Sequence, residues 1–445
     1  MNQTVIDTSR NKESSGASKK QILMAIIAST AGFSLDLFDL FLLLYVASSI
    51  SKLIFPISNP TLSLAATYGA FATSMIVRPL GSAVFGALAD KQGRKKALFI
   101  AMVGSGLLTT VMGIVPTYQQ IGGWAAVVFL ALRLLQGLFI GGVTASTHTI
   151  GTETVPASWR GWVSGVIVGG GGGLGAMLAS GVFYLASKAF PGPAFDVWGW
   201  RAMFFTGLLS AAFALYIFKH LNESPFFIEM QKKKENAAAA PKAPLKELFS
   251  SKYIKIVMLN LILVIGISSM YYLTTGYLPT FLGIINKVPK TETGVIMFWG
   301  SFIAFLAPIA LGQFSEMYGR RKAFILTAII GAILFGFVGY NQLSGIKDIK
   351  TITIYAFILA GFGNAGCAAV LIFLNERFPT AIRASGTAVC WNVGYAIGGL
   401  MPMIVSAVSP QVSDIPSRLT VFLFSAAALV LIGAIATPET KGQFD

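Results

Sequence analysis

The chain has 445 residues, of which 55% are hydrophobic and 11% are charged, whereas soluble domains carry roughly 25% charged residues. This composition excludes an ordinary soluble protein and predicts a membrane protein. The formal net charge is +15, but the basic residues gather in loops between apolar segments, so we expect no nucleic-acid partner.

Twelve apolar segments are long enough to cross the ~30 Å hydrocarbon core of a bilayer as helices. The first twenty residues are polar and lack the apolar core of a signal peptide, so we expect the first segment to stay in the membrane. The predicted fold class is an all-α membrane protein with twelve transmembrane helices. In chain order the predicted spans are 21–50, 64–89, 97–116, 124–150, 160–187, 199–220, 253–283, 293–316, 323–341, 352–375, 383–408 and 417–437.

The first span contains the sequence AGFSLDLFDLFLLLY, in which Asp36 and Asp39 are three residues apart and share a helix face. A carboxylate at mid-membrane costs about 2.5 kcal/mol or more, and such residues usually face a polar interior. Arg78 in the second span and Arg133 in the fourth fall at a similar central depth, since each helical residue rises about 1.5 Å.

Two interpretations of these charges remain open. They could be structural ion pairs, or Asp36 or Asp39 could carry an exchangeable proton while an arginine binds the substrate's carboxylate. Arginine suits the second role because its planar fork binds a carboxylate through two hydrogen bonds. We expect Arg133 to be the main anion contact, with Gln136 nearly one turn further on. Arg78 is the second expected contact, and the sequence does not distinguish the two aspartates.

The hydrophilic segment 221–252 combines a charge run with an alanine tract, which indicates a cytoplasmic linker between two halves. The expected organisation follows from it. It comprises a cytoplasmic tail at 1–20, a six-helix bundle at 21–220, the linker at 221–252, a second six-helix bundle at 253–437 and a cytoplasmic tail at 438–445.

The two halves repeat a loop motif, since GALADKQGRKK begins at Gly86 and GQFSEMYGRRK begins at Gly312. Such a parallel repeat is typical of secondary transporters whose substrate site lies between the halves. We expect the repeated charges to form a cytoplasmic gate, although ordinary basic loops with snorkelling side chains are the alternative. The gate residues are Asp90, Gly93, Arg94, Glu153 and Arg160, matched by Glu316, Gly319, Arg320, Glu376 and Arg383.

The distribution of basic residues predicts the orientation. If the N-terminus is cytoplasmic, 23 of the 33 Lys and Arg residues lie on the inner side and eight on the outer side. This is the positive-inside bias, so both termini are expected in the cytoplasm. The two cysteines fall in predicted spans and the chain has two histidines, so we expect no metal site and no cofactor. The same scarcity argues against an enzyme.

These loops resemble those of the major facilitator superfamily, and the resemblance covers almost the whole chain. VRPLGSAVFGALADKQGRKKA at 77–97, RLLQGLFIGG at 133–142 and ERFPTAIRASGTAVCWNVGYAIGGLMP at 376–402 are similar to the metabolite:proton symporter family. The first span departs from that family and is closer to sialate and lactate symporters. Trp391 stands where the family usually has Tyr before Asn392.

The resemblance implies a proton-coupled carrier in the cell inner membrane that takes up a small organic anion by alternating access, driven by the proton gradient. We expect Tyr271, Tyr272, Trp391 and Asn392 to complete the substrate site from the second half. The alternatives are a proton-driven exporter, a carrier of zwitterionic osmolytes, or a receptor without flux. The expected partners are the anion, protons and the lipid bilayer, and the chain is expected to be monomeric.

Overall fold

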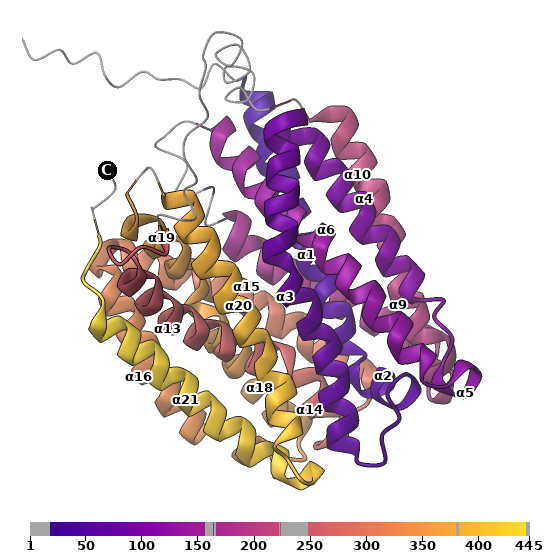
Figure 1. Ribbon diagram of the computed structural model, residues 1–445. Helices are drawn as coiled ribbons and strands as arrows, with labels where there is room; N and C mark the ends of the chain where they lie inside the picture. Colours follow the sequence, from indigo (N-terminus) through magenta and orange to yellow (C-terminus); the bar gives the residue numbers. More distant parts are fainter. Residues whose placement is uncertain are drawn as a thin grey trace, which may run out of the picture.

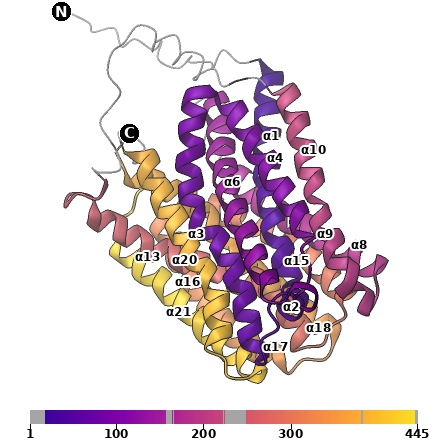
Figure 2. The same ribbon diagram turned by 45° about the vertical axis from the view of Figure 1, so that its right-hand side comes forward.

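In the computed structural model, the first half of the chain (indigo to magenta) and the second half (orange to yellow) form two helical bundles side by side (Figure 1). The same pairing of bundles is visible after a 45° turn (Figure 2). The structure describes residues 18–155, 163, 166–221, 223, 248–379 and 382–441. The predicted all-α class is confirmed.

The first bundle is built from long helices joined by short turns and a few short helical segments. Its elements are α1 (Lys19–Tyr45), α2 (Ala47–Leu53), α3 (Pro60–Gln92), α4 (Arg94–Met112), α5 (Tyr118–Ile121), α6 (Trp124–Thr154), η3 (Val166–Gly170), α8 (Gly171–Ala189), η4 (Phe195–Gly199), α9 (Trp200–Phe205) and α10 (Gly207–His220).

The second bundle has the same plan. Its elements are α13 (Ile254–Tyr271), η5 (Tyr272–Gly276), α14 (Leu278–Ile284), α15 (Lys290–Tyr318), α16 (Arg320–Phe337), α17 (Tyr340–Ser344), α18 (Ile349–Ala365), α19 (Cys367–Arg377), α20 (Arg383–Ala407), η6 (Val412–Asp414) and α21 (Ile415–Ala436).

Eleven helical stretches in the described part are long and apolar enough to cross a membrane. They coincide with eleven of the predicted spans; the remaining span, 160–187, corresponds to η3 and α8 and begins in residues outside the described part. The predicted span 253–283 contains a π-helical segment, because the N–H of Tyr277 donates to the carbonyl of Tyr272 five residues earlier at 3.0 Å. Such segments often occur at functional sites.

The turns around residues 54–59, 113–123, 190–194, 285–289, 338–348 and 408–414 all lie at one end of the spans, and following the charge bias we call it the outer end. The opposite end, with the turns at Gly93 and Gly319, is the inner end. Both glycines have positive φ, 104° and 109°, a region that other residues rarely adopt. The loop repeat predicted from sequence therefore has the same backbone geometry in both halves.

The bundles meet where α3 packs on α20 and α8 packs on α15. A Cβ on Gly294 would lie 2.9 Å from the Cα of Tyr184, so only glycine permits this approach. Toward the outer end, the Tyr68 hydroxyl donates to Thr280 at 2.8 Å and the Tyr68 ring stacks on Tyr277 with centroids 5.0 Å apart. These contacts join the halves above the middle of the spans.

Candidate functional site

A small cavity of about 50 Å³ lies between the two bundles at the level where α1, α3, α18 and α20 pass mid-span. Residues from both halves line it, as expected for a site that an alternating-access carrier must expose to each side in turn. The lining residues are Phe33, Leu37, Met75, Arg78 and Gly172 from the first half, and Tyr271, Tyr272, Asn364, Cys367, Trp391, Asn392 and Tyr395 from the second.

Arg78 brings a positive charge into the cavity wall and is held there by Asp36. Its Nη2 donates to Asp36 Oδ1 at 3.1 Å, and the two side chains are 9% and 0% exposed. The backbone around Arg78 is fixed by α6, because Gly141 packs directly against the Arg78 carbonyl and a Cβ would not fit. Asp36 lies behind the arginine and does not belong to the cavity lining.

Asp39 and Arg133 lie deeper inside the first bundle. Arg133 is fully buried between the rings of Phe129 and Phe204, at 5.7 and 5.9 Å from their centroids. Its Nη1 donates to Gln136 Oε1 at 2.8 Å, whereas its Nε and Nη2 have no hydrogen-bond partner among the described residues. The pair Arg133 and Gln136 is therefore enclosed by the bundle and does not line the cavity.

Asp39 is 1% exposed and lies within electrostatic range of Asp36, Arg78 and Arg133. Its Oδ1 has no hydrogen-bond partner in the described part of the chain. The four charges thus form a layered cluster in which Arg78 faces the cavity, Asp36 backs it, and Asp39 and Arg133 lie behind. The sequence prediction that these residues share one depth agrees with this cluster.

The second half supplies an aromatic wall. Tyr271 and Tyr272 flank the start of η5, with ring centroids 5.0 Å apart, and both line the cavity. Trp391 stacks on Tyr395 at 4.2 Å with an interplanar angle of 29°. Asn392 also lines the cavity, and its Nδ2 donates to the carbonyl of Ala388 at 2.9 Å. The four residues predicted from this half are therefore brought together.

Several other lining residues, among them Tyr395, Phe33, Leu37 and Met75, were not singled out from the sequence. Tyr395 had a usable signal, since it follows Trp391 by one helical turn in the same span. Phe33, Leu37 and Met75 had none, because an apolar residue in an apolar span does not reveal which face it occupies. From the sequence, Arg133 is the main expected anion contact and Arg78 the second. The structure favours the reverse, because Arg78, not Arg133, lines the cavity.

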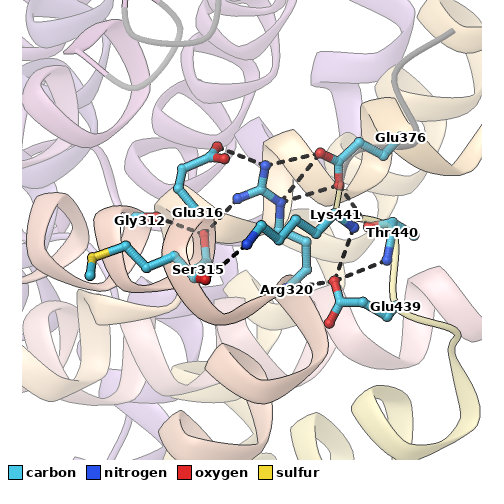
Figure 3. Close-up of polar contacts among 9 residues, drawn as sticks. Gly312, Ser315, Glu316, Arg320, Glu376, Glu439, Thr440 and Lys441 are labelled. Atoms are coloured by element: carbon cyan, nitrogen blue, oxygen red, sulfur yellow. Dashed lines mark hydrogen bonds and ion pairs between the residues drawn. The ribbon is translucent and has the colours of Figure 1, made fainter.

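At the inner end of the second bundle, Arg320 is the centre of a charge cluster (Figure 3). Its Nη2 donates to Glu316 at 2.7 Å and to Glu376 at 2.9 Å, and its Nη1 donates to Ser315 at 2.9 Å. Glu376 also accepts from the Thr440 hydroxyl at 2.6 Å. Three of the predicted gate residues, Glu316, Arg320 and Glu376, are thus joined within one half.

Glu439, beyond the last helix, completes this cluster by binding the start of α16. Its carboxylate accepts from the backbone N–H groups of Arg320 at 2.8 Å and Arg321 at 3.1 Å, and from Thr440 and Lys441 at 3.0 Å each. Partial burial alone would raise the pKa of Glu439, but the four backbone donors outweigh it and hold the pKa below its ordinary value.

The first half has the same contact between a carboxylate and the start of a helix. Glu223, three residues after α10, accepts from the N–H of Arg94 at 2.9 Å and of Lys95 at 3.2 Å, at the start of α4. Glu439 likewise follows the end of α21 by three residues. A carboxylate at a helix N-terminus is favourable because the unpaired N–H groups and the helix dipole attract negative charge. The equal spacing is a sequence signal for this pair that the repeated loop motif does not contain.

The remaining gate residues are placed only in part. Arg160 and the side chains of Asp90 and Glu153 lie outside the described residues. The Nε of Arg383 donates to the carbonyl of Phe378 at 3.2 Å, within the second half. The contacts described for the gate residues thus connect groups within one half or its flanking segment. Whether they also lock the two halves together stays a prediction.

Two repeated helical bundles around a central polar and aromatic cavity are the construction of a secondary transporter, not of an enzyme. The chain belongs to the Major Facilitator Superfamily, whose sequence pattern matches residues 24–403. It is accordingly a multi-pass membrane protein that binds a small-molecule substrate.

Individual relatives support the same class. The chain is 30% identical over 428 residues to "Inner membrane metabolite transport protein YhjE" of Escherichia coli (strain K12), with 94% of each chain covered. It is 29% identical to "Proline/betaine transporter" of the same strain, with 94% of this chain and 84% of the relative covered. Among solved structures, a D-xylose-proton symporter shares the fold with a TM-score of 0.73 at 18% identity, covering 95% of this chain and 99% of that one.

Proposed function

We propose that the protein is a proton-coupled symporter that takes up a small metabolite bearing a carboxylate. The observation that carries the proposal is Arg78, a guanidinium in the wall of a cavity that aromatic side chains also line. Its Nε has no hydrogen-bond partner among the described residues, so the guanidinium retains donor capacity. A guanidinium binds a carboxylate with two parallel hydrogen bonds, and the low dielectric of the membrane interior strengthens them.

For the coupled proton we favour Asp39 over Asp36. Asp36 is engaged with Arg78 at 3.1 Å, so releasing or binding a proton there would break an ion pair. Asp39 has an oxygen without a hydrogen-bond partner in the described part, and it senses the charge on Arg78 and Asp36. A carboxylate that binds Arg78 changes the electrostatic potential at Asp39, and with it the affinity of Asp39 for a proton. Substrate and proton binding are thereby coupled without direct contact.

A second candidate substrate is a zwitterionic osmolyte. The rings of Tyr271, Tyr272, Trp391 and Tyr395 line the same cavity as Arg78. Aromatic faces attract quaternary ammonium groups through cation–π interactions, so one wall could hold the cation of a betaine and the arginine its carboxylate. Relatives named proline/betaine transporters support this candidate.

The decisive experiment is reconstitution of the purified protein in liposomes with an imposed pH gradient, acidic outside. We expect labelled carboxylates from a mono- and dicarboxylate panel to accumulate, and accumulation to vanish when a protonophore removes the gradient. Glycine betaine in the same assay distinguishes the second candidate. Arg78→Gln should abolish uptake of either substrate, whereas Arg418→Gln, at an exposed arginine near the outer end of α21, serves as the matched control.

Substrate binding without flux would indicate a receptor and overturn the transport proposal, and accumulation only with the gradient reversed would indicate export. We place the protein in the cell inner membrane with both termini in the cytoplasm, as a monomer that needs no cofactor beyond the proton gradient. The orientation rests on the charge bias of the loops, and protease access to tags at the two termini in right-side-out vesicles tests it.

A further inference from the structure

A second and larger cavity opens at the outer end of the molecule, between the two halves. This outer vestibule has a volume of about 1010 Å³ and is lined by segments that include the ends of α2, α14 and α15. Its charged lining residues in the described structure are Lys52, Lys287, Lys290 and Asp196. The lining therefore carries a positive excess on the side of the membrane where basic residues are usually depleted.

The single acid of the vestibule is already neutralised. Asp196 accepts from the Lys290 Nζ at 2.9 Å and from the Ser49 hydroxyl at 2.6 Å. Lys290 also lies 4.1 Å from the centroid of the Phe195 ring. The positive charge that remains comes from Lys52 and Lys287, one from each half, and both side chains are exposed.

Lys287 is held in an unusual conformation. Its φ is 58°, and among the described non-glycine residues it alone has a positive φ. Bulky residues rarely occupy this backbone region. The preceding Asn286 fixes the turn, since its Nδ2 donates to the carbonyls of Leu343 at 2.8 Å and Ile346 at 3.0 Å. Glycine or asparagine adopts this backbone conformation more readily, so the geometry of the turn does not explain a lysine at this position.

The vestibule lies in line with the substrate cavity. Tyr45 lines the vestibule, its ring is 6.4 Å from that of Phe41, and Phe41 is 5.9 Å from Tyr271, which lines the central cavity. A row of three rings thus separates the two cavities, and Phe41 is fully buried in this row. A solute held in the vestibule would be next to the central cavity once these rings part.

We propose that the outer vestibule is an anion-binding site in which Lys52 and Lys287 collect the negatively charged substrate above the closed outer side. This rests on the proposed function for the identity of the anion, a small carboxylate, and it favours a net anionic substrate over a zwitterion. Clefts lined by one sign of charge raise the local concentration of the opposite ion by about 10-fold to 1,000-fold.

The vestibule can be tested without knowing the substrate. Ile57, 47% exposed on the vestibule wall, is replaced by cysteine and labelled from outside with methanethiosulfonates carrying either a sulfonate or a trimethylammonium group. Nearby lysines change the reactivity of the thiol equally toward both reagents, so the ratio of the two rates reports the local potential. The parent without Ile57→Cys is the labelling control, since Cys367 and Cys390 are buried.

At low ionic strength we expect the anionic reagent to react faster than the cationic one. The double variant Lys52→Gln, Lys287→Gln should lower the ratio of the anionic rate to the cationic rate by roughly 10-fold. The matched control is Lys347→Gln with Lys350→Gln, which removes two exposed outer lysines outside the vestibule lining and should leave the ratio unchanged. Equal rates for the two reagents, or a ratio that the vestibule variants do not change, would overturn the proposal.

A transport measurement then connects the vestibule to the substrate. In the Lys52→Gln, Lys287→Gln variant, carboxylate uptake below saturation should fall several-fold at low salt while the maximal rate is retained, and the deficit should disappear at high salt. An unchanged KM at low salt overturns the role in substrate collection. If no carboxylate is transported but the labelling ratio behaves as expected, the proposed function fails and the anion site stands.

Discussion

The ion pair between Asp36 and Arg78 is open to a quantitative test. Asp36→Asn removes the carboxylate and leaves the Arg78 guanidinium buried, with its side chain 9% exposed. Breaking a buried pair by removing one partner costs about 3–5 kcal/mol, because the remaining charge loses its compensation. Asp39 lies close enough to compensate in part, so we expect a loss of free energy of unfolding near 3 kcal/mol, the lower end of that range.

Thermal unfolding of the purified protein in detergent measures this loss for Asp36→Asn, Arg78→Met and the double variant. Replacing a whole buried pair is often neutral, so the double variant should unfold at a higher temperature than Asp36→Asn alone. Asp39→Asn is measured beside them; it removes the acid that acts on the buried Arg133, so it should lose stability as well. The matched control is Glu292→Gln, which removes an exposed carboxylate at the start of α15 and should unfold like the parent.

The same variants separate the roles of the two acids in transport. Asp39→Asn mimics the protonated carrier, so it should exchange labelled substrate in counterflow but fail to accumulate substrate on a pH gradient. Asp36→Asn should lose both activities along with stability. The reasoning is refuted if Asp36→Asn unfolds at the parent's temperature with no gain from Arg78→Met, or if Asp39→Asn still accumulates substrate.

Three further predictions follow from the placement of single residues. Arg78→Lys keeps the charge but loses the planar fork, so it should weaken substrate binding about tenfold or more. Arg133→Lys should mainly lower stability. Titrating each variant with substrate and following its thermal unfolding distinguishes the loss of binding from the loss of stability. Gly319→Ala places a Cβ at φ 109° against the Glu439 carboxylate and should lower the free energy of unfolding by about 1–3 kcal/mol. Gly86→Ala is the control, because a Cβ there meets nothing within 4 Å, and it should unfold like the parent. Asp90→Asn should slow transport with little effect on expression or substrate affinity, and a parental rate in proteoliposomes would contradict its gating role.

The sequence by itself determined the helices, the repeat and the presence of a charged site. Span length, loop charge and turn glycines act locally, so they can be read without the fold: the positive φ of Gly93 and Gly319 was implicit in two copies of one loop motif. Asp36, Asp39, Arg78 and Arg133 stood out because a charge in an apolar span is costly wherever the helix packs.

Only the tertiary structure decided which of these charges faces the cavity. In a span that is apolar all round, the sequence does not fix the rotation of the helix, and Arg133 is turned into the first bundle while Arg78 is turned to the cavity. Close glycine contacts such as Gly141 against Arg78 set that rotation, and they depend on which helices are neighbours. The carboxylates of Glu223 and Glu439 share a spacing after their helices that the sequence displays, but only the packing decides that they bind the starts of α4 and α16, far away in the sequence.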